Sequence, residues 1–255
     1  MTVDSRWLSE IVKLMISHPR IGIVQCSSIS MWDRVTFDSS MNYLDPLGYS
    51  YGYVPTDHPQ EVFFAEGMAF ALKRALLDEI GGLDDYYFME YDDMDFSWRA
   101  RLAGYSVYFL PSAIVYHARG GTVGRTYFER PKNVELYTRN HIVTLMKNHK
   151  IKNLVKVLPP VLAIEIGKIF YLMLITKNLK VAYAATRGVL EVLKDMRIVL
   201  TKRYEIRRLR ALSDRSVTSA MHRFNPGLLI PFLAMQAKGQ RFIMRSNPPI
   251  CGLEP

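Results

Sequence analysis

The order of hydrophobic and polar positions predicts alternating helices and strands over the first part of the chain. Residues 5–17 place apolar side chains on one side of a helix, which is expected to end at His18-Pro19. The pattern continues with strands or extended segments at 21–25, 61–64 and 68–73 and a helix at 74–80. This order indicates the α/β class. Residues 26–60, rich in Ser, Asp, Tyr, Gly and Pro without a sustained period, predict a long functional loop.

The stretch 87–117 combines several acids with a predicted helix. That helix is expected to begin directly on Asp92, Asp93 and Asp95. Asp95 would pair with Arg99 one turn later, because residues four apart are neighbours on a helix surface. The sequence therefore predicts a compact unit in which a helix opens on carboxylates.

Two short strands are expected after this helix, at 105–110 and 113–116, with a turn at Pro111 between them. The second strand would deliver His117 to its end, facing the acid-bearing helix start. Residues 118–130 contain three glycines and predict a flexible basic loop that could close over such a site.

Two interpretations of the acids stay open on the residues alone. A carboxylate at a helix start can act as the base in transfer to a hydroxyl, and a positioned base contributes roughly 10²- to 10⁴-fold. Alternatively, Asp92 is the helix N-cap and Asp95 complements the helix dipole, at about 1 kcal/mol each. Three acids within four residues repel one another, so helix capping alone does not account for all of them. His117 is either a metal ligand or a satisfied structural histidine.

The chain becomes apolar and basic after a predicted helix that opens on Pro131. Three charges and a Pro-Pro pair interrupt the apolar tract 154–176, which leaves no uncharged run of the roughly 18 to 20 residues that a spanning helix needs. We favour a helix or helix pair lying in the membrane interface over a spanning segment or an ordinary soluble helix. Residues 177–210 continue helically and end in a basic run, either a solvated face or a site for anionic lipid.

The formal net charge of +9 conceals two parts of opposite sign. Residues 1–120 hold 9 basic against 16 acidic residues, a balance of −7, whereas residues 121–255 hold 24 against 8, a balance of +16. An acidic part suits metal or sugar chemistry, and a basic, apolar tail suits an anionic membrane better than nucleic acid. Cys26 and Cys251 indicate neither a disulfide framework nor a zinc site, and they fit a reducing, intracellular setting. We recognise no secretory signal at the start.

The stretch GMAFALKRALLDEIGGLDDYYFMEYDDMDFSWRARLAGYSVYFLPSAIVYH resembles the second half of the catalytic domain of family 2 glycosyltransferases, particularly the rhamnosyl- and galactofuranosyl-transferase type. The positions that match the family pattern in order are Gly67, Gly81-Gly82, Asp92-Asp93, Asp95, Arg99, Gly104-Tyr105, Pro111, Ala113 and His117. Asp92 stands where the family commonly has Glu, and Leu83 and Asp85 replace its usual Phe and Glu.

The resemblance implies an incomplete GT-A fold. Residues 1–150 would be the acceptor-side half of that domain, and residues 151–255 a mostly helical, membrane-associated tail. The family's nucleotide-binding strands and its D-x-D pair are expected before Trp7, so we interpret the chain as the C-terminal portion of a transferase from a truncated or split gene or a misplaced start.

The resemblance also implies roles for single residues in inverting transfer from a nucleotide-sugar donor. Asp93 would be the catalytic base, with Asp92 beside it. His117 would help to coordinate a divalent metal, Mn or Mg, on the donor diphosphate. The residues expected on the acceptor side are Glu66, Gly67, Asp95 and Arg99.

The expected partners follow from the same resemblance and from the tail. They are a nucleotide-sugar donor, a glycan or lipid-linked acceptor, an anionic membrane surface, and either a separate N-terminal half or a second copy, without nucleic acid. We expect a place at the cytoplasmic face of the cell membrane, peripheral or inserted, in the synthesis of cell-surface polysaccharide or glycoconjugate. The alternative is a non-catalytic, membrane-associated module that binds a sugar or a partner protein.

Overall fold

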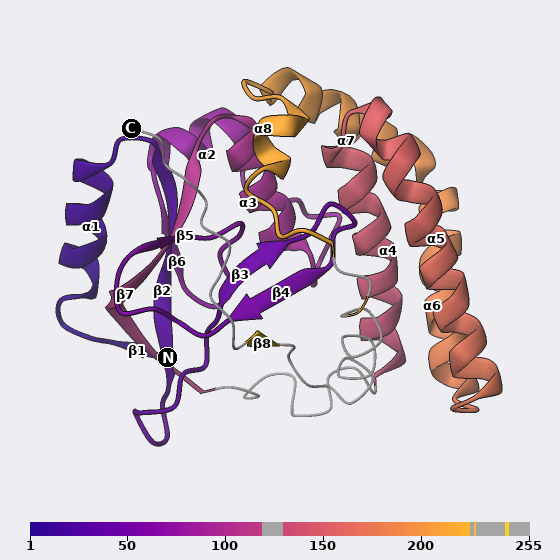
Figure 1. Cartoon of the computed structure of the whole chain (residues 1–255), viewed down its shortest axis with the longest axis horizontal. Coiled ribbons are helices and arrows are strands. Elements are labelled where there is room, and N and C mark those ends of the chain that lie inside the picture. Colours follow the sequence, from indigo (N-terminus) through magenta and orange to yellow (C-terminus); the bar gives the residue numbers. More distant parts are fainter. Residues whose placement is uncertain (119–129, 225–226, 228–242, 245–255) are drawn as a thin grey trace.

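A twisted sheet runs through the first half of the computed structural model, which describes residues 1–118, 130–224, 227 and 243–244 (Figure 1). Its strands are β1 (Thr2–Val3), β2 (Ile21–Ser30), β5 (Gln60–Glu61), β6 (Phe70–Leu72) and β7 (Ser106–His117). They lie in the order β1-β7-β2-β6, with β5 also paired to β7. The central strands β2 and β7 are parallel, and the others run antiparallel to their neighbours. The α/β class expected from the sequence is confirmed.

Strand β7 is a single element where two short strands were expected. Its ladder with β2 skips residues 111–113, which form a bulge around Pro111. A proline has no N–H to donate, so a bulge is where a strand tolerates it. Pairing then resumes to the end, where Ser30 lies opposite His117. The bulge thus explains why the sequence pattern breaks without ending the strand.

The prediction of a long loop at 26–60 is wrong for much of that segment. β2 continues to Ser30, and β3 (Met41–Leu44) and β4 (Ser50–Tyr53) form an antiparallel pair that extends to β8 (Ile243–Met244). Aromatic rings replace aliphatic side chains in this hairpin, because Tyr43, Tyr51 and Tyr53 are almost fully buried. A tyrosine buries as much apolar area as an aliphatic residue while looking polar in a sequence pattern.

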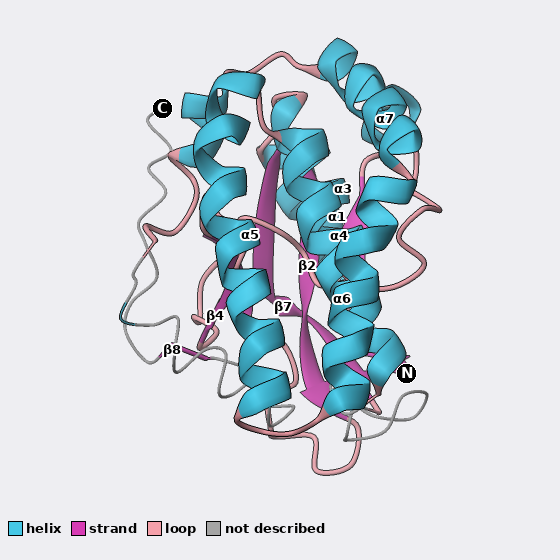
Figure 2. Cartoon of the chain, turned by 90° about the vertical axis from the view of Figure 1, so that its right-hand side faces the viewer, coloured by secondary structure: helices cyan, strands magenta, loops and turns pink. Residues whose placement is uncertain are grey.

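The helices form layers on both sides of the sheet (Figures 1 and 2). They are α1 (Trp7–Ser17), α2 (Arg74–Ile80), α3 (Asp92–Leu102), α4 (Pro131–Asn148), α5 (Ile151–Leu174), α6 (Leu179–Lys194), α7 (Met196–Leu209) and α8 (Asp214–Thr218). Adjacent residues of β2 serve opposite faces: Val24 packs in the cluster that contains Ile11 of α1, and Ile23 packs in the cluster of α3. Helix α4 stands beyond α3, and α5 and α6 are outermost.

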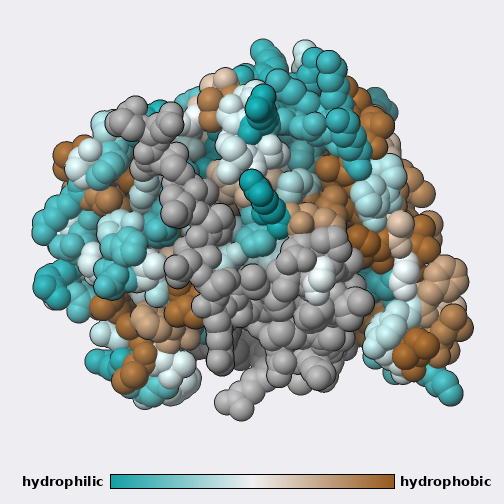
Figure 3. Space-filling model, viewed as in Figure 1, coloured by the Kyte–Doolittle hydropathy of each residue, from teal (hydrophilic) through white to brown (hydrophobic). Residues whose placement is uncertain are grey.

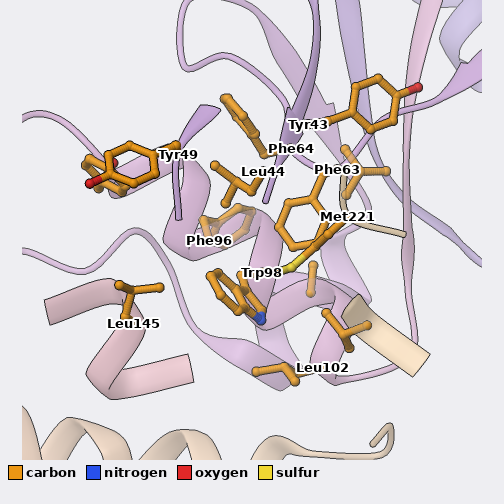
Figure 4. Close-up of a cluster of buried hydrophobic side chains, with 14 of the residues drawn as sticks. Tyr43, Leu44, Tyr49, Phe63, Phe64, Phe96, Trp98, Leu102, Leu145 and Met221 are labelled. Atoms are coloured by element: carbon orange, nitrogen blue, oxygen red, sulfur yellow. The ribbon is translucent and has the colours of Figure 1, made fainter. Parts of the chain in front are cut away.

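One main core joins the sheet, α3 and the tail helices (Figure 4). Trp98 of α3 meets Phe63 edge to face at 5.6 Å. Val161 of α5 and Val199 of α7 belong to the same cluster. Helix α6 approaches α4 closely at Gly188, where a Cβ atom would lie 2.6 Å from the backbone oxygen of Glu135. The helices after residue 150 therefore complete the core of the earlier part.

Helix α5 is, among the described residues, the one helix long and apolar enough to cross a membrane by length and composition. Core helices of soluble proteins meet the same criterion. The buried residues of α5 recur at three- or four-residue intervals as a stripe on one face: Leu154, Val157, Val161 and Glu165. Glu165 pairs with Lys168 and lies 3.5 Å from Nδ1 of His141 on α4.

The basic run of α7 is partly occupied within the protein. Lys202 pairs with Asp84 at 2.7 Å. Arg203 and Arg210 donate to backbone carbonyls at the end of α4, where the helix dipole favours positive charge. Arg203 and Arg210 thus attach the end of the tail helix α7 to α4, and Lys202 attaches α7 to the segment before α3, so the run is more than a solvated face.

Candidate active site

The loop that leads into α3 has an unusual backbone. Phe88, Glu90 and Tyr91 have φ angles of 61°, 65° and 66°, in the left-handed region that side chains other than glycine seldom adopt. Each such residue costs on the order of 1 kcal/mol or more and persists only where surrounding contacts hold it. Such strain clusters at functional sites, and here it directly precedes Asp92 and Asp93.

Two adjacent side chains of α4 hold this loop. The side-chain amide of Asn140 donates from Nδ2 to three loop carbonyls, those of Tyr87, Met89 and Glu90, at 3.2, 2.7 and 2.9 Å. Arg139 donates to the carbonyl of Tyr86 at 2.9 Å and lies over its ring. Asn140 is fully buried, so these bonds form away from water. The sequence predicts this helix but assigns no role to Arg139 or Asn140.

Asp93 lies in the first turn of α3 and is oriented by backbone groups. Its Oδ2 accepts a hydrogen bond from the N–H of Gly67 at 2.8 Å, and its Oδ1 accepts one from the N–H of Met94 at 2.8 Å. Burial and then the negative charge of Asp92 raise the pKa of Asp93, the Gly67 N–H offsets part of the rise, and the resulting pKa is about 7. A carboxyl group with this pKa exchanges protons near neutral pH.

The capping interpretation of Asp92 is wrong. The residue at the N-cap position is Tyr91, and no side chain makes a capping hydrogen bond there. Asp92 is instead the first residue of the helix and is partly exposed. A role in helix capping therefore does not explain the acidic pair.

Asp95 and Arg99 form the ion pair that their spacing predicts, with Nε and Oδ2 2.9 Å apart. The pair is buried and its polar atoms face the protein. Arg99 also donates to the carbonyls of Ile80 and Gly82 at 2.8 and 2.7 Å. Burial alone would raise the pKa of Asp95, but the charges of Lys147 and Arg99 outweigh it and lower that pKa. The side chains of Asp95 and Arg99 thus make their polar contacts within the protein interior.

Glu66 begins a buried polar network that the loop prediction for 26–60 missed. Its Oε1 accepts from the hydroxyl of Ser40 at 3.1 Å, and its backbone N–H donates to Oε1 of Gln25 at 3.2 Å. Ser40 also donates to Asn42 at 2.8 Å. At Gly67, a Cβ atom would lie 3.5 Å from the Asp93 carboxylate, an ordinary contact, so steric exclusion does not demand glycine there.

His117 ends β7 and is held by a carboxylate. Its Nδ1 lies 2.6 Å from Oδ2 of Asp38, whose backbone N–H donates to Ser28 of β2. Parallel strands β2 and β7 end together here, and ligands of α/β sheets bind outside the carboxyl ends of such strands. Asp38 carries no sequence signal of its own because it lies in the misread segment 26–60.

The fit of this site to a divalent metal is partial. With Nδ1 on Asp38, the Nε2 atom of His117 is the ring nitrogen left for a metal, and a carboxylate partner of this kind is typical of metal-binding histidines. Within residues 1–118 and 130–224, no three His, Cys, Asp or Glu side chains cluster as a metal would require. The described residues therefore supply one candidate metal ligand, His117, and do not supply a complete coordination shell. The predicted closing loop 118–130 falls almost entirely outside the described residues.

Comparison with known proteins identifies the family. A family model described as glycosyltransferase-like family 2 matches residues 2–141, from β1 through most of α4. The N-acetylglucosaminyl-diphospho-decaprenol L-rhamnosyltransferases of two Mycobacterium tuberculosis strains are each 32% identical over 71 residues. That match spans 28% of this chain and 22% of those relatives. With its mixed α/β arrangement and more than half of its length within the family model, the chain belongs to glycosyltransferase-like family 2.

Proposed function

We propose that this chain provides the acceptor-side part of an inverting glycosyltransferase, which moves a sugar from a nucleotide-sugar donor to a glycan or lipid-linked acceptor. The observation that carries the proposal is Asp93. It lies beyond a strained loop, two backbone N–H groups orient it, and burial raises its pKa to about 7. A general base works best with a pKa near the working pH.

In the proposed reaction, the acceptor hydroxyl oxygen attacks the anomeric carbon from the face opposite the nucleoside diphosphate. The new carbon–oxygen bond forms as the bond to the diphosphate breaks, and configuration at that carbon inverts. Asp93 takes the hydroxyl proton. We assign Glu66 and Gly67 to the acceptor side, and we assign Asp95 and Arg99 to holding α3, because their contacts lie within the protein.

A divalent metal, Mn or Mg, is part of the proposal with His117 as one ligand. When bound, it would supply positive charge to the leaving diphosphate. His117 is suited to this role because Asp38 fixes its ring. The remaining ligands would come from groups other than a cluster of the described residues.

The donor and acceptor classes are proposed from the relatives. Their name states that they transfer L-rhamnose to an N-acetylglucosaminyl-diphospho-decaprenol. We propose a sugar linked to a diphospho-polyprenol as the acceptor, at the cytoplasmic face of the membrane, in the synthesis of a cell-surface polysaccharide or glycoconjugate. The division into a catalytic part at 1–150 and a membrane-associated tail at 151–255 belongs to the same proposal.

The test is transfer by the protein in the longest form that its gene encodes. Nucleotide-activated L-rhamnose and an N-acetylglucosaminyl-diphospho-polyprenol are the first substrates, with Mn²⁺ present, and mass spectrometry of the lipid product reads out transfer. We expect a product one sugar heavier, with inverted anomeric configuration, that the Asp93→Asn variant does not form. Titration calorimetry with a panel of nucleotide sugars and Mn²⁺ widens the donor search. Binding without transfer to any acceptor would favour a non-catalytic sugar-binding module.

A further inference from the structure

The turn between α5 and α6 presents apolar side chains to the outside. Six of them, each more than half exposed, lie on the last turns of α5, in the turn and on the first turns of α6: Phe170, Tyr171, Leu174, Ile175, Leu179 and Tyr183. Figure 3 shows brown and tan residues along this edge of the molecule, at the lower right. We call residues 166–183 the hairpin tip. An apolar cluster on a protruding tip is typical of an interaction surface.

The hairpin tip has a core of its own. Val181 and Ala185 of α6 pack with Val134 of α4, and Ile169 and Leu172 of α5 pack against them. The turn is closed by backbone hydrogen bonds, including that from Asn178 to Leu172 at 3.0 Å, and the Asn178 side chain caps α6 by accepting from Val181. The apolar side chains that remain outside are therefore displayed by a structured hairpin.

Charge around the hairpin tip selects the partner. Between Glu165 and Glu191 the chain has no acidic residue and four basic ones: Lys168, Lys177, Lys180 and Arg187. Lys177 and Lys180 are exposed beside the apolar cluster. A second copy of the chain would bring like charges together, whereas anionic lipid headgroups complement them. The tyrosines at positions 171 and 183 are of the kind enriched at membrane interfaces.

The base of the hairpin is anchored to the protein. Glu165 is 1% exposed, pairs with Lys168 and lies beside His141 and Thr138 of α4. A spanning position for α5 would strip this carboxylate of its partners on α4 and place it in hydrocarbon, which is expensive. Shallow insertion of the tip keeps those contacts. The structure therefore favours a docked hairpin over a spanning helix.

The hairpin tip lies at the same end of the molecule as the candidate site. Strand β1 pairs with the last residues of β7, which ends at His117. The N-terminus marks that end in Figures 1 and 2, and in both views the turn between α5 and α6 lies at the same lower end. The tip and the carboxyl end of β7 therefore face the same end of the molecule.

We propose that the hairpin tip docks on an anionic bilayer, with its apolar residues in the interface and Lys177 and Lys180 among the headgroups. Docking holds the His117 end of the protein against the membrane, where a lipid-linked acceptor is confined. The use of such an acceptor rests on the proposed function. The docking itself does not, because it follows from the tip alone.

Vesicle sedimentation tests this docking without any donor or acceptor. The full chain is mixed with vesicles of phosphatidylglycerol and phosphatidylcholine in equal parts, or of phosphatidylcholine alone. We expect binding to the anionic vesicles that weakens with salt. Lys177→Gln with Lys180→Gln should weaken it about thirtyfold, since each lysine near an anionic surface contributes about a factor of five. Lys152→Gln with Lys156→Gln, at the other end of α5, is the matched control and should bind as wild type.

A second variant removes the apolar contribution. Phe170→Ser, Leu174→Ser and Ile175→Ser together should weaken binding by about a hundredfold or more. The control is Leu8→Ser, Val12→Ser and Ile16→Ser, three comparably exposed apolar residues of α1, which should bind as wild type. Circular dichroism verifies that each variant is folded.

Three outcomes would overturn the docking proposal. They are equal binding of the hairpin variants and their controls, no binding of the wild type to anionic vesicles, or a concentration-dependent dimer in sedimentation velocity that the triple serine variant alone abolishes. Transfer to a soluble acceptor by a chain that does not bind vesicles would refute docking and leave the proposed reaction standing. Vesicle binding by a chain inactive on every acceptor would do the reverse.

Discussion

Two acids in the first turn of α3, Asp93 and Asp95, lie in opposite surroundings. Asp95 receives four side-chain donors, from Arg99, Lys147, Asn148 and Tyr87, at 2.8 to 3.2 Å. Asp93, two residues earlier, is oriented by two backbone N–H groups and has acidic neighbours. The pKa of Asp95 is lowered, and the pKa of Asp93 is raised to about 7.

This difference separates an acid that stabilises the fold from the acid that we propose as the base. The ionised form of a buried acid such as Asp95 is stabilised by the cations that pair with it. Asp93 is partly buried among other acids, which opposes its ionisation and lowers stability. Such groups concentrate at functional sites. The strained backbone of loop 88–91, which Asn140 holds in place, also lowers stability, and this loop directly precedes the helix start that carries Asp93.

The comparison is tested most severely at Asp93. The Asp93→Asn variant should lose roughly 10²- to 10⁴-fold in transfer rate, because a positioned base is removed. Its stability should rise at pH 8, since the wild-type carboxyl group must ionise where burial opposes it. Product formation and urea unfolding measure the two effects. A variant that keeps full activity would refute the assignment of Asp93 as base.

Replacing the neutralised acid should have the opposite signature. The Asp95→Ala variant is expected to lose about 3–5 kcal/mol of unfolding free energy, because Arg99 is left buried without its carboxylate and Lys147 keeps only Asp84. Urea denaturation measures the loss. The control is Asp85→Ala, an exposed acid, which should change stability by about 0.5 kcal/mol or less. Similar losses in both variants would contradict the comparison.

Helix α4 supplies hydrogen-bond partners to Asp95 and to the loop before Asp93. Its packing against α6 depends on Gly188. The Gly188→Ala variant should destabilise the fold by about 1–3 kcal/mol, because the new methyl group meets the Glu135 backbone. Gly167→Ala on α5 is the matched control: no atom lies within 4 Å of its Cβ position, so stability should rise by about 0.5–1 kcal/mol. Thermal unfolding distinguishes the two signs.

Removing the Asn140 contacts to loop 88–91 should disturb the position of Asp93 more than that of Asp95. The Asn140→Ala variant removes the side-chain donor to the carbonyls of Met89 and Glu90, at about 1–3 kcal/mol in stability, whereas the carbonyl of Tyr87 keeps Arg139 as a donor. The turnover number should fall more than the Michaelis constant changes, since loop 88–91 would no longer fix the start of α3. Unchanged turnover in a less stable protein would show that the contact is structural only.

The last test concerns pH. Asp93 binds its proton more tightly in the folded protein than unfolded, so stability falls as pH rises from about 4 through about 7. Activity should rise over the upper part of that window as the base ionises. The Asp92→Asn variant removes a neighbouring negative charge, and the midpoint of the pH–rate profile should move to lower pH. A midpoint that moves upward would contradict the stated cause.

Local pattern sufficed for the parts of this protein that depend on neighbouring residues. The spacing of Asp95 and Arg99 predicted their ion pair, the acids before Trp98 predicted a helix start, and Pro131 predicted the beginning of α4. The order of these segments also predicted the α/β class. Each of these features rests on contacts within a turn or two of helix, where sequence distance and spatial distance agree.

The segment 26–60 and the partners of the site were decided by tertiary structure. Buried tyrosines hid two strands from a pattern built on aliphatic residues, and the partner of His117, Asp38, lies 79 residues away in the chain. Asp92, Asp93 and Asp95 look alike in sequence. The sequence determined that acids open this helix, and only the fold, by delivering Lys147 and Asn148 to Asp95 and a backbone N–H to Asp93, decided which acid is neutralised.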